Sequence, residues 1–366
     1  MGRKAVKFPV QKDTEFITEL RKLVDLYFDK EHITRFGNKK LLSKTIFMFL
    51  LYLTPYILMI TGVFHSFSSV IICWVFIGMG KAGVGMAVMH DANHRSYSGN
   101  DSVNKWMGNT LYMLGGFPPN WKYQHNTLHH GYTNIDGSDE DIATGAYLRI
   151  SPHQPLLKIH RYQHLYAWFL YGLMTLSWVT AGDFRQLSRY LKTDVPLVKD
   201  YSATRLFLIL IVSKIFYYGV FIAVPMLILP FAWYWIIVFF LAMHFTSGLI
   251  LTTIFQTAHV VPTSSFPLPD LNGQMNSNWA IHQLLTTADF APQRKVLSWL
   301  IGGLNYQIEH HLFPNISHVH YPKIAVLVRE IALKYGIPYH VQPGFFAAVR
   351  EHVRMLRMLG REAVPV

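Results

Sequence analysis

The sequence predicts an all-α integral membrane protein: four transmembrane helices form two hairpins, and a helical cytosolic cap holds a histidine-rich metal site. Three observations predict this class. First, 51% of the 366 residues are hydrophobic and only 15% are charged, whereas soluble domains carry about 25% charged residues. Second, the apolar residues are gathered in long blocks. Third, many of the 19 histidines fall in short clusters beside those blocks. A disordered chain, a collagen-like chain and a small disulfide scaffold are excluded by this composition.

The four apolar blocks cover about 45–64, 68–89, 207–229 and 231–255. Each holds about 20 residues, enough to cross a hydrocarbon core about 30 Å thick. Only short breaks separate the first block from the second and the third from the fourth, so we expect two hairpins. The chain then divides into a cytosolic N-terminal segment (1–44), a membrane domain (45–340) and a cytosolic C-terminal tail (341–366). We expect no cleaved signal peptide, because the first 40 residues contain no apolar core.

The basic residues predict the orientation in the membrane. Eleven Lys and Arg lie in residues 1–44, ten in 90–204 and nine in 261–366, and the two short hairpin loops contain none. Cytoplasmic segments carry an excess of Lys and Arg. We therefore expect a multi-pass protein with both termini and the metal site in the cytoplasm, and a bacterial inner membrane rather than the endoplasmic reticulum. The net charge of +12 then reflects topology and attraction to an anionic lipid surface, and no nucleic-acid partner is expected.

Two shorter apolar stretches, 106–117 and 165–180, are expected to lie in the membrane interface or in the cap. If 165–180 crossed the membrane, the last third of the chain would lie on the opposite side from residues 90–160, against the charge pattern. The run from Gly78 to Gly83 matches a dinucleotide-binding fingerprint, but it lies inside an apolar block. We interpret Gly78, Gly80, Gly83 and Gly85 as small residues that allow close helix packing.

Three histidine clusters and one further histidine are the candidate metal ligands. In HDANH, HNTLHH and QIEHH, residues four apart share one face of a helix, so their side chains reach one place. His259 lies where the fourth block ends. The candidate ligands are His90, His94, His125, His129, His130, His259, His310, His311 and Gln307. The pair His160 and His164 has the same spacing, but we expect it to be exposed at the membrane interface.

Eight imidazoles and one amide are too many for one ion, since zinc sites close with about four ligands, so two metals are expected. The only cysteine is Cys73, which excludes a thiolate site or an iron–sulfur cluster and leaves nitrogen and oxygen donors. Such donors suit iron, copper, nickel or zinc. Nearby carboxylates are expected to accept the other ring N–H and fix each tautomer: Asp91, Asp139, Asp141 and Glu309. For Asp136 and Glu140, a solvated loop charge is an equally good interpretation.

These motifs resemble the three histidine boxes of the membrane fatty acid desaturase family. They occur in the family's order, with the apolar blocks at the expected places, over about residues 40–340. The stretch GLNYQIEHHLFPNISHVHYP is especially similar to the front-end group, whose third box begins with Gln in place of His. The resemblance implies that the candidate histidines hold two non-haem iron ions. Gln307 then binds through its amide oxygen, binds through water, or only supports the site.

The resemblance also implies the reaction. The enzyme uses O2 as co-substrate and two electrons to place a cis double bond in an acyl-CoA or acyl-lipid substrate. For the front-end group we expect an already unsaturated C18 chain, with the new bond on the carboxyl side. The His-Pro-Gly-Gly haem motif of a fused cytochrome b5 domain is not in the sequence, so we expect an external electron donor of the ferredoxin or cytochrome b5 type. Trp121, Tyr123 and Trp279 are candidates for the wall of an apolar substrate tunnel.

Alternatives remain open at this point. A sphingolipid desaturase or a lipid hydroxylase uses nearly the same boxes. From other classes, the histidines suit paired haems in a membrane cytochrome, or zinc in a transporter or scaffold. The sequence contains no nucleophile–base motif such as G-x-S-x-G, and an unactivated methylene group cannot be deprotonated. The reaction is therefore expected to need no catalytic residue beyond the metal centre.

Overall fold

The computed structural model describes residues 5–10, 14–193, 197–199 and 201–361. The chain folds as two compact units. Unit 1 comprises Met1–Gly37, Gln124–Ala167 and Ile254–Val366, and unit 2 comprises Asn38–Tyr123 and Trp168–Thr253. Residues 362–366 of the predicted C-terminal tail lie outside the described residues. The predicted domain limits stay a prediction.

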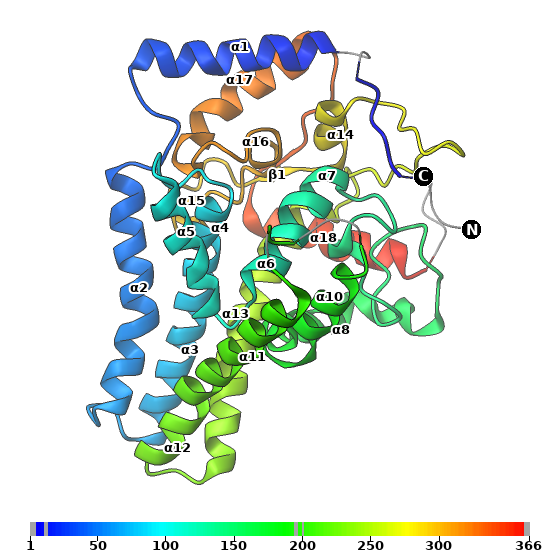
Figure 1. Cartoon of the computed structure of the whole chain (residues 1–366). Helices are drawn as coiled ribbons and strands as arrows, with labels where there is room; N and C mark the ends of the chain where they lie inside the picture. Colours follow the sequence, from blue (N-terminus) through cyan, green and yellow to red (C-terminus); the bar gives the residue numbers. More distant parts are fainter. Residues whose placement is uncertain (1–4, 11–13, 194–196, 200, 362–366) are drawn as a thin grey trace. The chain divides into compact units, whose positions relative to one another are not determined.

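Unit 2 contains the apolar helices (Figure 1). Its helices are α2 (Lys39–Ile60), α3 (Phe67–Val84), α4 (His90–Asn93), α5 (Asp101–Asn109), α6 (Pro118–Trp121), α9 (Met174–Ser177), α10 (Asp183–Tyr190), α11 (Ala203–Tyr218) and α12 (Val224–Ile228). Two helices continue from one unit into the other: α8 (Gln163–Gly172) and α13 (Trp233–His259). α2 and α3 pack side by side along their length.

Within the described part of the chain, four helical segments are long and apolar enough to cross a membrane: Lys39–Ile60, Phe67–Asn93, Ala203–Ile228 and Trp233–His259. Their outer faces carry exposed apolar side chains, such as Leu50 on α2 and Ile215 and Phe216 on α11, and exposed apolar surface of this kind needs lipid around it. The mostly helical class with four candidate membrane helices is therefore confirmed.

The first three of these segments begin where a polar side chain caps the backbone. Asn38 accepts from the amide of Lys40, Ser66 from that of Ser69, and Ser202 from that of Arg205. Such caps satisfy amides that have no partner inside the helix. The first apolar block begins at residue 45, but the cap at Asn38 starts α2 six residues earlier, at Lys39.

Three of the four glycines predicted to allow close helix packing, all three in α3, do so. A Cβ atom at Gly78 would lie 2.5 Å from the carbonyl oxygen of Met243, one at Gly80 would overlap the backbone of Tyr52, and one at Gly83 would overlap the side chain of Met48. Gly85 differs, because a Cβ there would meet its neighbours only at ordinary van der Waals distance. The packing interpretation is therefore wrong for Gly85.

Two lysines that interrupt the apolar blocks are buried with polar partners in unit 2. The Nζ of Lys81 lies 3.0 Å from Nδ1 of His244 and 3.3 Å from the hydroxyl of Tyr217. Lys214 donates to Asp183 at 2.5 Å and to the carbonyl of Gly115 at 2.6 Å. Ionisable side chains inside apolar bundles need such partners, so these lysines do not argue against the membrane assignment.

The stretch 165–180 is broken into α8 and α9 and is not among the four candidate spans. The expectation for the neighbouring histidine pair is wrong at His160, whose side chain is buried. Its Nε2 lies 2.9 Å from the carbonyl of Ala146, and its Nδ1 accepts from the amide of Leu157. Both ring nitrogens are thus used to hold a local turn, which the H-x-x-x-H spacing does not reveal.

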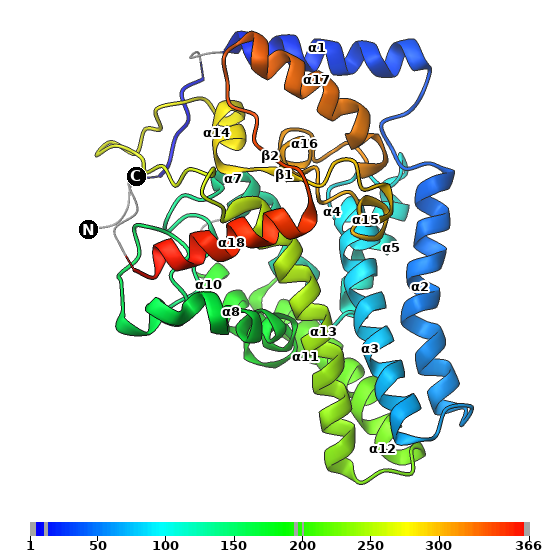
Figure 2. The same cartoon turned by 180° about the vertical axis from the view of Figure 1, so that it is seen from behind.

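Unit 1 contains the remaining elements: α1 (Thr14–Glu31), α7 (His130–Tyr132), α14 (Trp279–Thr286), α15 (Lys295–Leu300), α16 (Gln307–Leu312), α17 (Tyr321–Lys334), α18 (Phe345–Leu359), and the strands β1 (Asp289–Phe290) and β2 (Val341–Gln342). The two short strands pair in parallel. Figure 2 shows α1 lying along α17. This contact forms because one face of α1 presents Phe16, Leu20, Val24 and Phe28 at helical spacing, and all four are buried.

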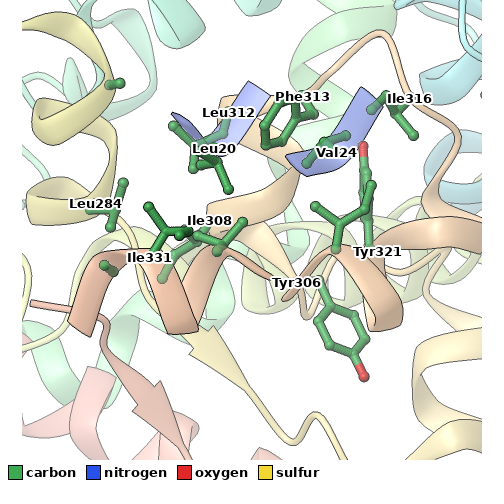
Figure 3. Close-up of a cluster of buried hydrophobic side chains, with 14 of the residues drawn as sticks. Leu20, Val24, Leu284, Tyr306, Ile308, Leu312, Phe313, Ile316, Tyr321 and Ile331 are labelled. Carbon is green, nitrogen blue, oxygen red and sulfur yellow. The ribbon is translucent and has the colours of Figure 1, made fainter. Parts of the chain in front are cut away.

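The apolar core of unit 1 lies directly over the helix that carries the third histidine motif. Figure 3 shows Leu20 and Val24 of α1 pointing into a cluster that includes Ile308 and Leu312 of α16 and Ile331 of α17. Because α16 has only six residues, it is too short to be stable alone. Its position therefore depends on this packing.

We expect Leu20→Ala to lower the free energy of unfolding by about 2–5 kcal/mol, the usual cost of a cavity in a packed core. Chemical denaturation in detergent micelles measures the change. Leu26→Ala is the matched control, because Leu26 lies on the same helix with 50% of its surface exposed, whereas Leu20 is fully buried. Equal effects of the two substitutions would show that α1 does not pack on unit 1 in this way.

Candidate metal centre

The second histidine motif lies on a π-helix, Lys122–His129, that runs into α7. A π-helix forms hydrogen bonds between residues five apart, and such turns are frequent at functional sites. In an α-helix, with 3.6 residues per turn, His130 would point about 140° away from His125. Here the two rings meet, with their centroids 4.8 Å apart and their Nε2 atoms 3.3 Å apart. The π-helix therefore brings all three imidazoles of the motif together.

The third motif forms α16, where Gln307, His310 and His311 are all buried. A side chain from β1 holds the start of this short helix: Asp289 accepts from the amide of Ile308 at 3.0 Å. His259 enters as the last residue of α13. Asn134 supports the segment around His259, because its side-chain amide donates to the carbonyls of His259 (3.0 Å), Ser265 (3.2 Å) and Thr286 (3.3 Å).

His129, His259 and His311 form the tightest imidazole group in unit 1. Their ligand nitrogens lie within 4.8 Å of one another, and their ring centroids are 4.8–4.9 Å apart. Each ring places Nδ1 against an oxygen: Asp139 (3.1 Å) for His129, the carbonyl of Thr286 (3.4 Å) for His259, and Gln283 (2.8 Å) for His311. A hydrogen bond at Nδ1 leaves Nε2 as the ligand nitrogen.

A second group contains His125, His130 and His310. The centroid of His130 lies 4.8 Å from that of His125 and 4.6 Å from that of His310. The Nδ1 of His310 lies 3.2 Å from the hydroxyl of Tyr321. The groups are joined through His130 and His311, whose rings stack 4.4 Å apart. Two adjacent clusters of imidazoles are what two metal ions would require.

Buried polar atoms at the centre test whether a metal fits. Within the described residues, Nε2 of His129, Nε2 of His259 and Oε1 of Gln307 are buried without a hydrogen-bond partner. Burial of a polar atom without a partner is costly. The side chain of Gln307 interacts with the ring of His259, and the ring of His129 lies 4.8 Å from that of His259, so these polar atoms are close together. Nitrogen and oxygen lone pairs that converge in a buried place fit a transition-metal ion.

Carboxylates beside His129 supply negative charge. Asp139 is buried and Asp141 is partly buried, with one oxygen 3.4 Å from Nδ1 of His129. Burial by itself lowers the pKa of His129, but the charges of Asp139 and Asp141 outweigh it and the pKa is raised. Burial raises the pKa of Asp141 to about 7, and Asp141 accepts a hydrogen bond from Gln124.

Glu309 was expected to accept a ring N–H from a histidine, but its carboxylate contacts the hydroxyl of Tyr339. It is buried with Asp289, and the hydroxyl of Tyr339 lies 2.7 Å from Asp289 and 2.9 Å from Glu309. Burial raises the pKa of Glu309 well above its usual range, and the neighbouring charge of Asp289 adds to the rise. Asp289 also accepts from the amide of Ile308, which ties this acidic pair to the backbone of α16.

The first motif belongs to unit 2. His90 begins α4, directly after a π-helical turn at Gly85–Met89, and His94 ends the helix. Their ring centroids are 4.8 Å apart, and the ring of Trp121 lies 5.9 Å from His90 and 6.1 Å from His94. Asp91 is buried on the same turn.

The three residues predicted to line a substrate tunnel, Trp121, Tyr123 and Trp279, lie in different surroundings. Tyr123 makes an edge contact with Tyr190, at 4.8 Å between centroids. In unit 1, Trp279 donates its indole N–H to the carbonyl of His130 at 2.9 Å. Trp121 and Trp279 thus each contact a histidine of the motifs, and Tyr123 packs against another aromatic ring.

The sequence did not reveal several residues that support the ligands: Asn134, Gln283, Asp289 and Tyr339. It also did not reveal that His282 contacts the carbonyl of Thr133, next to the second motif. None belongs to a histidine box. One signal was present, because His282 and Gln283 interrupt the apolar run WAIHQLLTT, and polar residues in such a run point to buried hydrogen bonds. Asn134 also occupies the left-handed region, with φ 58°, which Asn tolerates better than most residues.

Comparison with known proteins gives a consistent result. Residues 66–343 match the family described as "Fatty acid desaturase". The chain is 33% identical over 350 residues to an sn-1 linoleoyl-lipid 6-desaturase of Arthrospira platensis, covering 95% of this chain and 93% of the relative. It is 33% identical to the sn-1 linoleoyl-lipid 6-desaturase of Synechocystis (93% and 94% covered) and 32% identical to an acyl-lipid (8-3)-desaturase of Physcomitrium patens (94% and 72% covered).

Asp139→Asn should weaken metal binding about 10- to 100-fold, the usual cost of removing a carboxylate that supports a ligating histidine. The metal content of the purified chain measures the effect. Asp136→Asn is the control, since Asp136 lies in the same loop and is not among the residues whose ligand atoms converge. The role assigned to Asp139 would be wrong if both variants kept the wild-type metal content.

Proposed function

The chain belongs to the fatty acid desaturase family, and we propose that it introduces a cis double bond into an unsaturated C18 acyl chain of a membrane lipid. As a desaturase, the protein is an oxidoreductase. The third histidine box predicted its similarity to front-end desaturases. The observation that carries the proposal is the buried convergence of His129, His259 and His311, each with Nδ1 turned to an oxygen acceptor.

We propose iron as the metal, because the resemblance to the desaturase family implies it and imidazole ligands suit it, and the number of imidazoles favours two ions. When bound, a di-iron centre supplies the oxidant for hydrogen removal from an unactivated methylene group by using O2 and two electrons. The proposed ligands in unit 1 are His125, His129, His130, His259, His310 and His311. His90 and His94 complete the proposed set, and that part rests on the histidine boxes of the sequence. Gln307 is proposed as an oxygen donor, because its Oε1 is buried beside His259.

The protein's own groups hold the ligands and exclude water. Asp139 fixes the orientation of His129, and Asp289 anchors the backbone that presents His310 and His311. The core formed by α1, α14, α16 and α17 covers this site with apolar side chains. A dry, preorganised pocket protects a reactive oxidant from side reactions. Trp279 and Trp121, each in contact with a histidine motif, are proposed to line the path of the acyl chain.

The substrate class is proposed from the relatives. The relatives reported above are named for linoleoyl-lipid or acyl-lipid substrates, which favours a lipid-bound acyl chain over acyl-CoA. We propose that the metal centre lies on the cytoplasmic side of the membrane, which the distribution of the basic segments supports. The two relatives from Arthrospira and Synechocystis support a bacterial membrane. Electrons are proposed to come from a separate carrier of the ferredoxin or cytochrome b5 type.

Expression in a host that lacks polyunsaturated fatty acids tests the reaction. When linoleate is fed, we expect a triene with the new double bond on the carboxyl side of the two existing ones, located by gas chromatography and mass spectrometry. Stearate should give no product, since the front-end reaction needs an existing double bond. New hydroxyl groups without new double bonds would instead identify a hydroxylase. A Soret band in the purified protein would identify a haem protein.

His94→Ala and His311→Ala should each abolish product formation while the protein still inserts into the membrane, because each removes a proposed iron ligand. Product yield and membrane abundance are measured together. His65→Ala is the control, since His65 is exposed in the loop between α2 and α3. Product formation by either ligand variant would remove that residue from the ligand set.

A further inference from the structure

Gln283 lies outside every histidine motif, on α14, and is fully buried. We propose that Gln283 is a positioning residue of the metal centre: its amide fixes the tautomer of His311 and ties the second histidine motif to the third. The proposal rests on the proposed function, because it concerns a residue beside the same site. Three hydrogen bonds carry it.

The first bond fixes the orientation of the amide. The Nε2 of Gln283 donates to the carbonyl oxygen of His130 at 3.2 Å. A carbonyl oxygen only accepts, so the NH2 group must face His130. If the amide were turned by 180°, two acceptor oxygens would face each other in a buried place, which is costly.

The second bond then fixes the proton on His311. With the NH2 group at His130, Oε1 of Gln283 lies 2.8 Å from Nδ1 of His311. An amide oxygen carries no proton, so Nδ1 must be the donor. A neutral imidazole has one N–H, which leaves Nε2 of His311 with its lone pair. That nitrogen is the one a metal requires.

The third bond extends the link to the neighbouring ligand. The hydroxyl of Thr133 lies 2.9 Å from Oε1 of Gln283 and 2.7 Å from the carbonyl of His129. Its oxygen also lies 3.3 Å from Nδ1 of His311, a longer contact than the 2.8 Å between that nitrogen and Gln283. The single hydroxyl proton goes to one of these acceptors, and both oxygens are held in either case. Gln283 thus connects α14 to the segment of His129 and His130 and to α16.

The amide also sets the charge beside His311. His129 has a carboxylate at Nδ1, whereas His311 has a neutral amide. A carboxylate makes a ligating histidine more basic, so the two ligands of one group differ in donor strength. Glutamate at position 283 would keep the acceptor and add charge, and leucine would keep the approximate volume and remove the acceptor.

The test uses Gln283→Leu and Gln283→Glu in the full chain, with Gln163→Leu as the control. Gln163 is equally buried in unit 1 and makes three backbone hydrogen bonds, with both backbone groups of Arg149 and the carbonyl of Leu356. Fe(II) alone is titrated anaerobically into metal-free protein in detergent micelles. We expect Gln283→Leu to weaken Fe(II) binding about 10- to 100-fold. Gln283→Glu keeps the acceptor at His311 but loses the donor to the carbonyl of His130, so it should bind Fe(II) more tightly than Gln283→Leu and less tightly than the wild type. Gln163→Leu should lose thermal stability but keep its Fe(II) affinity.

A second measurement is independent of iron. The nitrogen chemical shifts of 15N-histidine in metal-free protein report each tautomer, and His311→Asn identifies the signal of His311. We expect the Nδ1-protonated form in the wild type and in Gln283→Glu, and its loss in Gln283→Leu. An unchanged tautomer together with unchanged Fe(II) affinity in Gln283→Leu would overturn the proposal. If the wild type binds no Fe(II), the proposed function fails, and the His311 signal still decides the role of Gln283.

Discussion

The metal site depends on one constraint: a buried neutral imidazole can offer one nitrogen as a ligand only if its other nitrogen has an acceptor for the N–H. In unit 1 that acceptor is different for each ring of the tightest group. It is a carboxylate for His129, a backbone carbonyl for His259 and a side-chain amide for His311. The loops and short helices around the site are arranged so that these oxygens reach the rings. The candidate site therefore needs these acceptor oxygens as well as the ligands.

The backbone meets this constraint by departing from regular α-helix. The π-helix of the second motif brings His125 and His130 together, and α16 has only six residues, so its position is set from outside. Asp289 binds its first turn, while apolar residues of α1, α14 and α17 cover it. A regular α-helix in the second motif would instead turn His130 about 140° away from His125.

Much of the fold, and the histidine motifs that form the candidate site, could be predicted from the sequence, because both follow from local patterns. Apolar blocks define the candidate spans, and spacing of four defines the histidine motifs. The residues that orient the ligands could not be found in this way. Gln283 contacts His130 across 153 positions of the chain, and no local pattern marks that contact. The burial of His160 was missed for the same reason, since its partners depend on how residues 146–160 turn.

The buried carboxylate of Asp139 favours a cation at the candidate metal site. Asp139 is almost completely removed from water, and a buried carboxylate is costly unless a positive charge lies beside it. Burial lowers the pKa of His129, but the charges of Asp139 and Asp141 raise it by more. A metal ion at Nε2 of His129 would place a positive charge beside these carboxylates. In the Asp289–Glu309 pair, burial and the charge of Asp289 raise the pKa of Glu309. The hydroxyl of Tyr339 contacts both carboxyl groups, and Asp289 also accepts from the amide of Ile308 in α16. The two acidic clusters therefore have separate tasks: one favours a cation at the ligands, and the other holds the helix that presents them.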